Sequence, residues 1–388
     1  MPEENAKITP APPRGFAAEE YEARAEAVQR RMAAAGFGAL LLSAAADIQY
    51  FSGFLTRFWQ SPTRPWFLAI PARGKPVAVI PEIGARGMAK TWISDIRCWP
   101  SPRPQDEGVS LLVSVLRDMG GKIGMALGAE SALRMPPADW LKLRAALPGE
   151  IGDCAALLQQ QRMIKSPREI EKIRYSARAV SAAFAALPQG AHGLRESAVC
   201  RRLQADILQN GADEIPYLAA ASGAGGYDTV IMPPQDTTPA AGEVLMIDIG
   251  AVYDGYFCDF DRNYAVGKAA NGAQKAHSAL HRAMRAGIAA ARPGNTAAAV
   301  WRAMRETLSE AGDVGRMGHG IGVQLTEPPS LAAHDETVLR EGMVLAVEPS
   351  VKTGEGLQMV CEENIAVGEE AELLTIPAAE ELPVIPAA

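Results

Sequence analysis

The sequence predicts an α/β protein with two domains, on three observations. The chain has 388 residues, which is too long for one ordinary hydrophobic core. Helical stretches alternate with short strand-like apolar runs up to about residue 155. A strong helix start at Ser166 then opens a second, α+β series of elements. We therefore predict a flexible Pro-rich tail at 1–15, a smaller N-terminal domain at 16–158 and a C-terminal domain at 159–388.

The smaller domain is predicted from its local signals. A charged, alanine-rich stretch favours an exposed helix, and Gly36 ends it before the first strand. Turn residues at 72–75 separate two further apolar runs. The predicted elements are a helix at 17–35 and strands at 39–42, 67–70 and 76–80.

The C-terminal domain begins with a long helix. Ser166 is a suitable N-cap, Pro167 occupies the first helical position and Glu169 completes a capping box. Apolar residues recur at helical spacing until Pro188 stops the run. Further helices are predicted at 194–209, 273–291 and 296–310, and strands at 243–252, 255–264, 343–348 and 357–367.

Composition excludes several classes of partner. The net charge of −7 leaves no basic excess for nucleic acid or for anionic membranes. The N-terminus has no secretory pattern, and no apolar run reaches the length of a membrane span. Five cysteines are scattered without a C-x-x-C pair, which is typical of reduced thiols. We expect a cytoplasmic protein without a nucleic-acid or membrane partner.

Three aspartates lie in two strand-like runs around Asp254-Gly255, a dipeptide that favours a two-residue hairpin turn. Counting back from this turn places Asp248 opposite Asp261 and Gly250 opposite Asp259. Because side chains alternate between the faces of a strand, the three carboxylates should point the same way.

Three such carboxylates would repel one another and lose hydration if the face is covered. A cluster of divalent cations is the simplest remedy, because hard cations prefer oxygen ligands. A solvent-exposed face with hydrated acids is the alternative. The flanking apolar residues favour the cation site, and they are Val244, Leu245, Ile247, Ile249, Phe257 and Phe260.

Three later motifs complete a pattern with Asp248 and Asp259. They place His319 in Gly-His-Gly-Ile-Gly, Glu348 in Glu-Pro and Glu362 in Glu-Glu-Asn. The order of the five residues and the eleven-residue step between the aspartates resemble the pita-bread metallopeptidases. That family includes methionine aminopeptidase, aminopeptidase P, prolidase and creatinase. The resemblance implies a pita-bread catalytic domain after a creatinase-type α/β domain.

The resemblance also implies roles for these residues. Asp259 and Glu362 would bridge two divalent ions (Mn, Zn, Co or Fe), Asp248 and Glu348 would each bind one ion, and His319 would complete a site. A hydroxide held between the ions would attack an amide C–N bond, and Glu348 could transfer the proton. The expected enzyme is an Xaa-Pro dipeptidase or aminopeptidase, a homodimer acting on a short peptide or small molecule.

The sequence departs from the family pattern where peptides are expected to bind. Thr326 stands where a second histidine is usual, just before Glu327, and residues 227–233 lack another expected histidine. We predict Glu348, Thr326 and Glu327 as catalytic residues. These departures leave open a non-peptide enzyme, either a small-molecule amidohydrolase, a creatinase-like amidinohydrolase or a lyase. A non-catalytic binding protein is a third reading, which the complete ligand set opposes.

Further predicted residues surround the centre. Asp261 replaces a usual threonine and is predicted as a hydrogen-bonded acid beside the ligands, while an extra ligand or a partner of Arg262 remains open. A loop at 56–66 combines arginines with aromatic rings, which suits an anionic or planar substrate. The alternative is that this loop packs against its own domain and does not contact a substrate. The predicted substrate-binding residues are Arg57, Trp59, Arg64 and Tyr227.

Overall fold

The structure is a computed structural model, and it describes residues 10–61, 64–147, 151–308 and 315–387. It contains two compact units, one at Pro13–Arg162 and the other formed by the chain from Met163 onward together with the described residues before Pro13. Most of the predicted tail, residues 1–9, lies outside the described residues, and the predicted domain limits stay predictions. No described helix is both long enough and apolar enough to cross a membrane.

The first unit is built on a mixed six-stranded sheet in the order β4-β3-β2-β1-β5-β6. Its strands are β1 (Phe37–Leu42), β2 (Phe67–Pro71), β3 (Val77–Pro81), β4 (Asp95–Trp99), β5 (Lys122–Met125) and β6 (Ile151–Asp153). Its helices are α1 (Ala18–Ala35), α2 (Ala45–Ser52), η1 (Arg57–Gln60), η2 (Glu82–Gly84), α3 (Ala85–Met88), α4 (Val109–Met119) and α5 (Pro137–Ala146), and α6 (Ala155–Met163) follows. The predicted helix and three strands are confirmed to within two residues.

The second unit contains two larger sheets and a hairpin. The first sheet has the order β17-β9-β8-β7, and the second has the order β11-β10-β12-β15-β16. The strands are β7 (Glu214–Ala224), β8 (Glu243–Tyr253), β9 (Tyr256–Val266), β10 (Gly318–Gly320), β11 (Glu327–Ser330), β12 (Val344–Val347), β13 (Ser350–Gly354), β14 (Leu357–Val360), β15 (Glu363–Ala366), β16 (Glu372–Leu373) and β17 (Val384–Ile385). The helices are α7 (Pro167–Ala186), η3 (Leu187–Gln189), α8 (Glu196–Gln209), α9 (Asn271–Ala290) and α10 (Ala297–Thr307).

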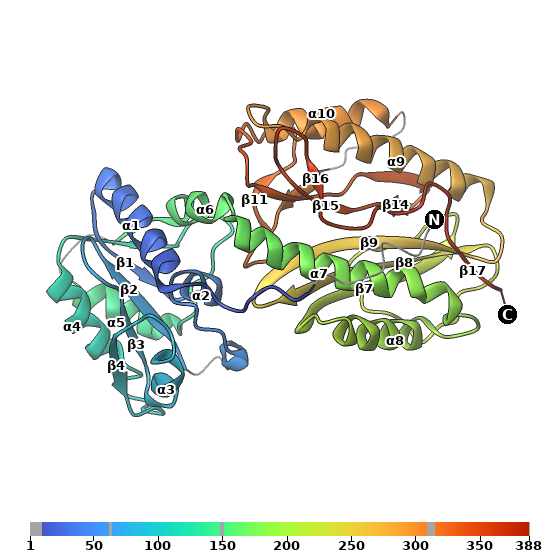
Figure 1. The fold of residues 1–388 in the computed structure, drawn as a ribbon. Helices are drawn as coiled ribbons and strands as arrows, with labels where there is room; N and C mark the ends of the chain where they lie inside the picture. The colour runs from blue at the N-terminus through green and yellow to red at the C-terminus, as the bar shows by residue number, and fades with distance from the viewer. Residues whose placement is uncertain (1–9, 62–63, 148–150, 309–314, 388) are drawn as a thin grey trace. The chain divides into compact units, whose positions relative to one another are not determined.

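Helices cover the sheets of this unit on two sides. α7 and α8 pack along the sheet of β7, β8 and β9, while α9 and α10 lie together on the opposite side of the unit (Figure 1). A continuous apolar core joins α9 and α10 to strands of both sheets, and it includes Met246, Leu280, Met304, Leu345 and Met359. The strands between these helical layers are therefore held rigidly, which suits them to position polar side chains.

The start of α7 follows the predicted capping pattern. The Ser166 hydroxyl accepts a hydrogen bond from the Glu169 backbone N–H at 3.3 Å, and the Glu169 carboxylate accepts one from the Ser166 N–H at 2.7 Å. Two N–H groups that a helix start would leave unpaired are thereby satisfied. The predicted capping box is confirmed.

The second unit differs from the sequence prediction in several strands, because the short strands β10, β11, β13, β16 and β17 were not predicted, and two further differences bear on the site. β7 was not predicted, because its alanines and Pro216 have weak strand propensity and only pairing with β8 makes the segment extended. The single strand predicted at 357–367 is instead two strands, interrupted at Cys361 and Glu362. The interruption arises because β14 pairs with β13 whereas β15 pairs with β12.

The capping box yields a stability prediction. Ser166→Ala should lower the free energy of unfolding by about 1 kcal/mol, because the side-chain acceptor at the helix start is lost. Scanning calorimetry should show the transition of this unit lowered by about 2–4 °C. The matched control is Ser278→Ala, whose hydroxyl bonds only the Gln274 carbonyl within α9 and where alanine favours the helix. Equal melting of Ser166→Ala and wild type would refute the contribution of the cap.

Candidate metal centre

The hairpin of β8 and β9 adopts the predicted register. Its turn, Asp254-Gly255, has φ of 49° and 80°, the two positive values that a type I′ turn requires. Asp248 pairs with Asp261, and Gly250 pairs with Asp259. Because the turn fixes the register, the three carboxylates lie on one face of the hairpin.

β7 extends this arrangement by one strand. Two neighbouring rungs cross β7, β8 and β9, namely Tyr217–Gly250–Asp259 and Ala219–Asp248–Asp261. Side chains within a rung lie on the same face, so the Tyr217 ring borders the acids. Gly250 leaves a gap in its rung, and the Cδ1 atom of Leu325 lies 2.3 Å from where a Cβ would stand. Tyr217 was missed in the sequence because β7 itself was missed.

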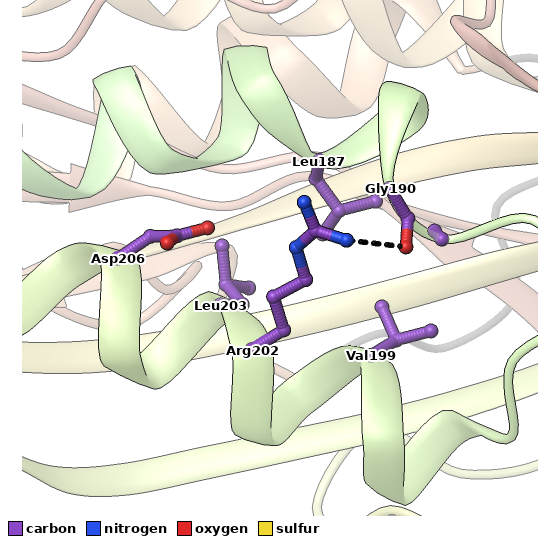
Figure 2. A pocket seen from close by; sticks show the side chains of 7 residues that line it. Leu187, Gly190, Val199, Arg202, Leu203 and Asp206 are labelled. Carbon is purple, nitrogen blue, oxygen red and sulfur yellow. Dashed lines mark hydrogen bonds between the residues drawn. The ribbon is translucent and has the colours of Figure 1, made fainter.

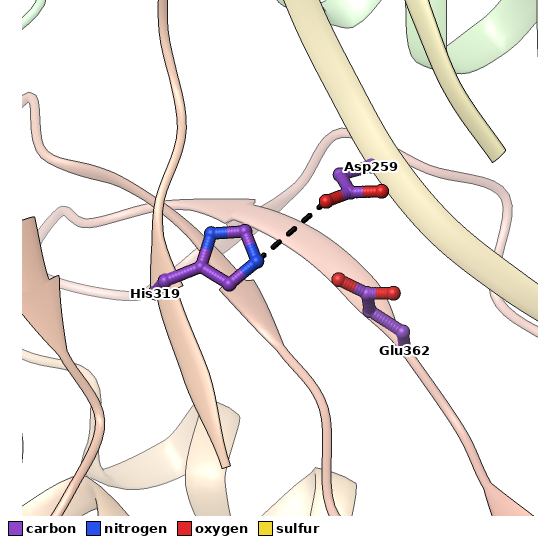
Figure 3. A group of neighbouring side chains, drawn as sticks. All are labelled: Asp259, His319 and Glu362. Carbon is purple, nitrogen blue, oxygen red and sulfur yellow. Dashed lines mark ion pairs between the residues drawn. The ribbon is translucent and has the colours of Figure 1, made fainter. Parts of the chain in front are cut away.

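Residues from the second sheet meet this face. Ligand atoms of Asp259, His319 and Glu362 all lie within 4.8 Å of one another (Figure 3). The Nε2 atom of His319 is 3.6 Å from Asp259 Oδ2 and 3.9 Å from Glu348 Oε1. His319 belongs to β10, Glu348 follows β12, and Glu362 occupies the interruption between β14 and β15. With Asp248 on the adjacent rung, the structure gathers all five predicted ligands.

Burial and hydrogen bonding test whether this donor set fits a cation. Asp259, His319 and Glu362 are buried, whereas Asp248 and Glu348 are partly open. Within the described part of the chain, buried carboxylate oxygens of Asp248, Asp259 and Glu362 have no hydrogen-bond partner. Buried oxygens of this kind are costly unless a donor or a cation satisfies them. The site therefore fits hard divalent ions.

The electrostatics of the centre lead to the same conclusion. Burial raises the pKa of Asp248 and of Glu348 to about 7. Burial, and then the neighbouring carboxylates, raise the pKa of Asp259 and Glu362 well above their ordinary values. Protons and divalent cations therefore compete for the same oxygens near neutral pH.

The imidazole of His319 is set up as a ligand. Its Nδ1 lies 3.0 Å from the Gly320 carbonyl, which can only accept a hydrogen bond, so Nδ1 carries the proton. Burial lowers the pKa of His319 to about 4. The neutral ring thus presents the Nε2 lone pair to the acids.

Two polar side chains anchor the ligands, and of these the sequence did not single out Asn364. The Asn364 carbonyl oxygen accepts a hydrogen bond from the Asp259 backbone N–H at 3.0 Å, and its amide donates back to the Asp259 carbonyl. Arg262 donates to the Glu362 carbonyl at 3.0 Å and to the Glu363 carboxylate at 3.0 Å. Arg262 therefore pairs with Glu363, and its contact with Asp261 is to the backbone oxygen.

The other predicted catalytic residues lie near the centre in different settings. Thr326 is half-exposed, beside Leu325. Glu327 is buried, and its carboxylate lies 3.1 Å from the Nζ of the equally buried Lys165. The structure gives Glu327 an ion-pair partner rather than a place in the acid cluster. Tyr227, predicted to bind substrate, is fully enclosed in the core.

The predicted substrate loop packs within the first unit. The Trp59 ring stands edge-on to Trp66 at 5.6 Å between centroids, and the Arg134 guanidinium lies 5.4 Å from it. Arg64 covers the Phe58 ring at 5.4 Å, and Arg57 is exposed. Residues 62–63 of the loop lie outside the described residues. These contacts correspond to the local-packing alternative, and the substrate role of the loop stays a prediction.

A small pocket lies apart from the acid cluster, between η3 and α8 (Figure 2). The Arg202 side chain reaches across it and donates a hydrogen bond to the Gly190 carbonyl at 3.1 Å. Leu187, Val199 and Leu203 form its apolar wall. Because the Arg202 guanidinium already donates to the backbone, we interpret the pocket as a feature of the packing between η3 and α8.

A layered α/β unit that gathers carboxylates and a neutral imidazole on rigid strands defines a metal-dependent hydrolase. The chain belongs to metallopeptidase family M24, whose family model matches residues 171–369. The creatinase/prolidase N-terminal domain model matches residues 24–164. The predicted resemblance and fold class are confirmed, and membership implies divalent metal cofactors.

Named relatives share most of the chain. A probable dipeptidase PepE of Mycobacterium tuberculosis is 29% identical over 354 residues, which cover 87% of this chain and 89% of that protein. An Xaa-Pro dipeptidase of Pyrococcus horikoshii is 30% identical over 234 residues, covering 58% and 66%. The crystal structure of dipeptidase PepE from Mycobacterium ulcerans matches with a TM-score of 0.82 at 27% identity, covering 96% and 99%. These relatives support a metal-dependent peptidase and do not favour the non-peptide alternative.

The raised pKa values predict how metal stabilisation depends on pH. Without metal, carboxyls whose folded pKa is raised stabilise the fold at low pH, and this stabilisation is lost as pH rises through about 7 for Asp248 and Glu348. Added Mn²⁺ should replace the lost protons, so the metal-induced rise in Tm should grow between about pH 5 and 7.5. Calorimetry of chelator-treated protein with and without Mn²⁺ measures the shift, and a shift independent of pH contradicts the assignment.

Proposed function

We propose that this protein is a dinuclear metallopeptidase that hydrolyses Xaa-Pro dipeptides. The observation that carries the proposal is the convergence of Asp259, His319 and Glu362 within 4.8 Å, with buried oxygens that lack hydrogen-bond partners among the described residues. Relatives named as dipeptidase and Xaa-Pro dipeptidase support the substrate class.

In this proposal Asp259 and Glu362 would be shared by two ions, Asp248 and Glu348 would each hold one, and His319 would complete one site. Four carboxylates then offset the charge of two divalent cations, and the ions are Mn, Zn, Co or Fe. Bound ions of this kind polarise a peptide carbonyl and lower the pKa of a water molecule. The protein's own contribution is to fix the donors and to move protons.

Glu348 is the acid best placed to move a proton. Its side chain is 28% exposed, more than those of Asp259 or His319, so it is the most accessible of the three to a substrate. It is proposed to accept the proton of the attacking water and to donate it to the proline nitrogen as the peptide bond breaks. The amine product then leaves as a neutral group.

Two hydroxyl groups are proposed to replace the missing histidines. Tyr217 is half-buried on the same face as Asp259, and its hydroxyl donates to the Val230 carbonyl at 3.2 Å. Burial, and then nearby Asp248, raise the pKa of Tyr217, so the phenol keeps its proton and remains a donor. The half-exposed Thr326 hydroxyl, and the Tyr217 hydroxyl once it turns away from the Val230 carbonyl, are candidates to donate a hydrogen bond to the carbonyl oxygen of the scissile bond.

Arg316 is proposed to select dipeptides. It is exposed, and its Nε lies 3.7 Å from Glu348 Oε1. A dipeptide carries a free carboxylate close to its only peptide bond, and a guanidinium beside the proton-transferring acid suits that group. The two residues before Glu362 are Val360 and Cys361 and carry no positive charge, so Arg316 would supply the cation.

The proposal also covers the cellular compartment, the oligomeric state and the partners of the enzyme. All five cysteines are free thiols, which is consistent with a reducing cytoplasm. A homodimer and a short-peptide substrate are proposed from the family resemblance. Neither nucleic acid nor membrane is proposed as a partner, given the net charge of −7.

Asp259→Ala tests the catalytic assignment. Loss of this carboxylate should lower kcat/KM for Xaa-Pro dipeptides by about 10³-fold, since the metal contribution of several kcal/mol depends on it. Release of free proline from a dipeptide panel measures the rate, and metal analysis of the same samples should show reduced content. Asp236→Ala, an exposed aspartate elsewhere in the unit, is the control. Equal rates for Asp259→Ala and wild type would refute the proposal.

Arg316→Ala tests dipeptide selection separately. It should raise KM for Xaa-Pro dipeptides by about 10- to 100-fold, the range for losing a hydrogen bond to a charged group. Arg316→Lys should retain part of the affinity, because it keeps the charge but not the paired geometry. The matched Xaa-Pro amides lack the carboxylate, and their KM should change little. A similar rise for acids and amides would count against carboxylate recognition.

A further inference from the structure

We propose that Asp261 is an additional metal ligand, so that five carboxylates rather than four surround the ions. This inference rests on the proposed function. The family pattern usually has a threonine at this position, whereas here the run is Asp259-Phe260-Asp261. The centre of this chain would therefore carry one more negative charge than the pattern implies.

Position is the first support. Asp261 pairs directly with Asp248 across the β8–β9 ladder, so both side chains lie on the metal-facing side. Asp261 is 1% exposed, which leaves water little access to its carboxylate. Its neighbours on that face are the candidate ligands themselves.

The accounting of hydrogen bonds is the second support. The Asn263 amide donates to Asp261 Oδ2 at 2.8 Å. The other oxygen, Oδ1, is buried and has no hydrogen-bond partner among the described residues. Arg262 gives Oδ1 no hydrogen bond, because its side chain donates to the Glu363 carboxylate at 3.0 Å and to the Asp261 backbone carbonyl. One oxygen is therefore held while the other is left for a cation.

A chain of fixed groups orients this carboxylate. The Asn263 amide also donates to the Val360 carbonyl at 2.7 Å, and its oxygen accepts from the Tyr227 hydroxyl at 3.1 Å. That hydroxyl accepts from the Val360 N–H at 2.7 Å. Each donor and acceptor of the Asn263 side chain has a partner, so this amide has a single orientation. The Asn263 amide in turn fixes the orientation of the Asp261 carboxylate. Polar partners that fix a ligand in this way are a common feature of metal sites. The arrangement also accounts for the enclosed position of Tyr227.

Cobalt binding tests the inference, because Co²⁺ reports its ligands through visible absorption. The metal-free wild type, Asp261→Asn, Asp261→Thr and the exposed control Asp236→Asn would be titrated with Co²⁺ by calorimetry and spectroscopy. Asp261→Asn keeps an acceptor for the Asn263 amide but removes the charge. We expect about 100-fold weaker binding of at least one ion and an altered Co²⁺ spectrum in both Asp261 variants. Asp236→Asn should match wild type.

The Tm values of the metal-free proteins distinguish two roles for Asp261, namely a metal ligand and an acid that only stabilises the fold. Replacing a buried acid whose second oxygen has no hydrogen-bond partner among the described residues should leave the metal-free Tm equal or higher, while the Co²⁺-induced rise in Tm becomes smaller. If the Asp261 variants bind two ions with wild-type affinity and spectrum, the inference about Asp261 is wrong, and the proposed function is unaffected. Wild type that binds no Co²⁺ would overturn the proposed function with it. A lower metal-free Tm with unchanged Co²⁺ affinity would mark Asp261 as structural and also overturn it.

Discussion

Repulsion among buried carboxylates is the constraint on which the second unit depends. Asp248, Asp259 and Glu362 each have a buried carboxylate oxygen without a hydrogen-bond partner among the described residues, and a flexible scaffold would let these acids separate. Paired strands prevent this, since each acid is held by a ladder or by a junction between two ladders. Asn364 and Arg262 strengthen the frame by binding the backbone of the acids rather than their carboxylates. The carboxylates are thereby kept available for cations.

The sequence predicted the parts of this centre that local rules determine. Asp254-Gly255 fixes a turn, and the two-residue period of a strand then fixes which side chains share a face. The five ligand positions followed from their order and spacing in a family pattern. Ser166 was predictable for the same reason, because a capping box is contained within four consecutive residues.

Features set by distant parts of the chain were not predictable. Tyr217 reaches the centre only because β7 pairs with β8, and nothing in its alanine-rich segment requires that pairing. The ion pair of Glu327 with Lys165, 162 positions away, could not be read from local sequence, and the predicted catalytic role of Glu327 stays a prediction. The enclosed position of Tyr227 likewise depends on Val360 and Asn263. Each of these outcomes depends on tertiary contacts rather than on local propensity.

Gly250 has a consequence for the metal-free enzyme. The Leu325 methyl group fills the space that a side chain at this position would occupy, so an apolar contact seats the segment carrying Thr326 on the sheet. Such a contact depends on shape and not on charge. The contact of Leu325 with the sheet does not depend on bound ions, so loss of the metal should leave the segment carrying Thr326 in place.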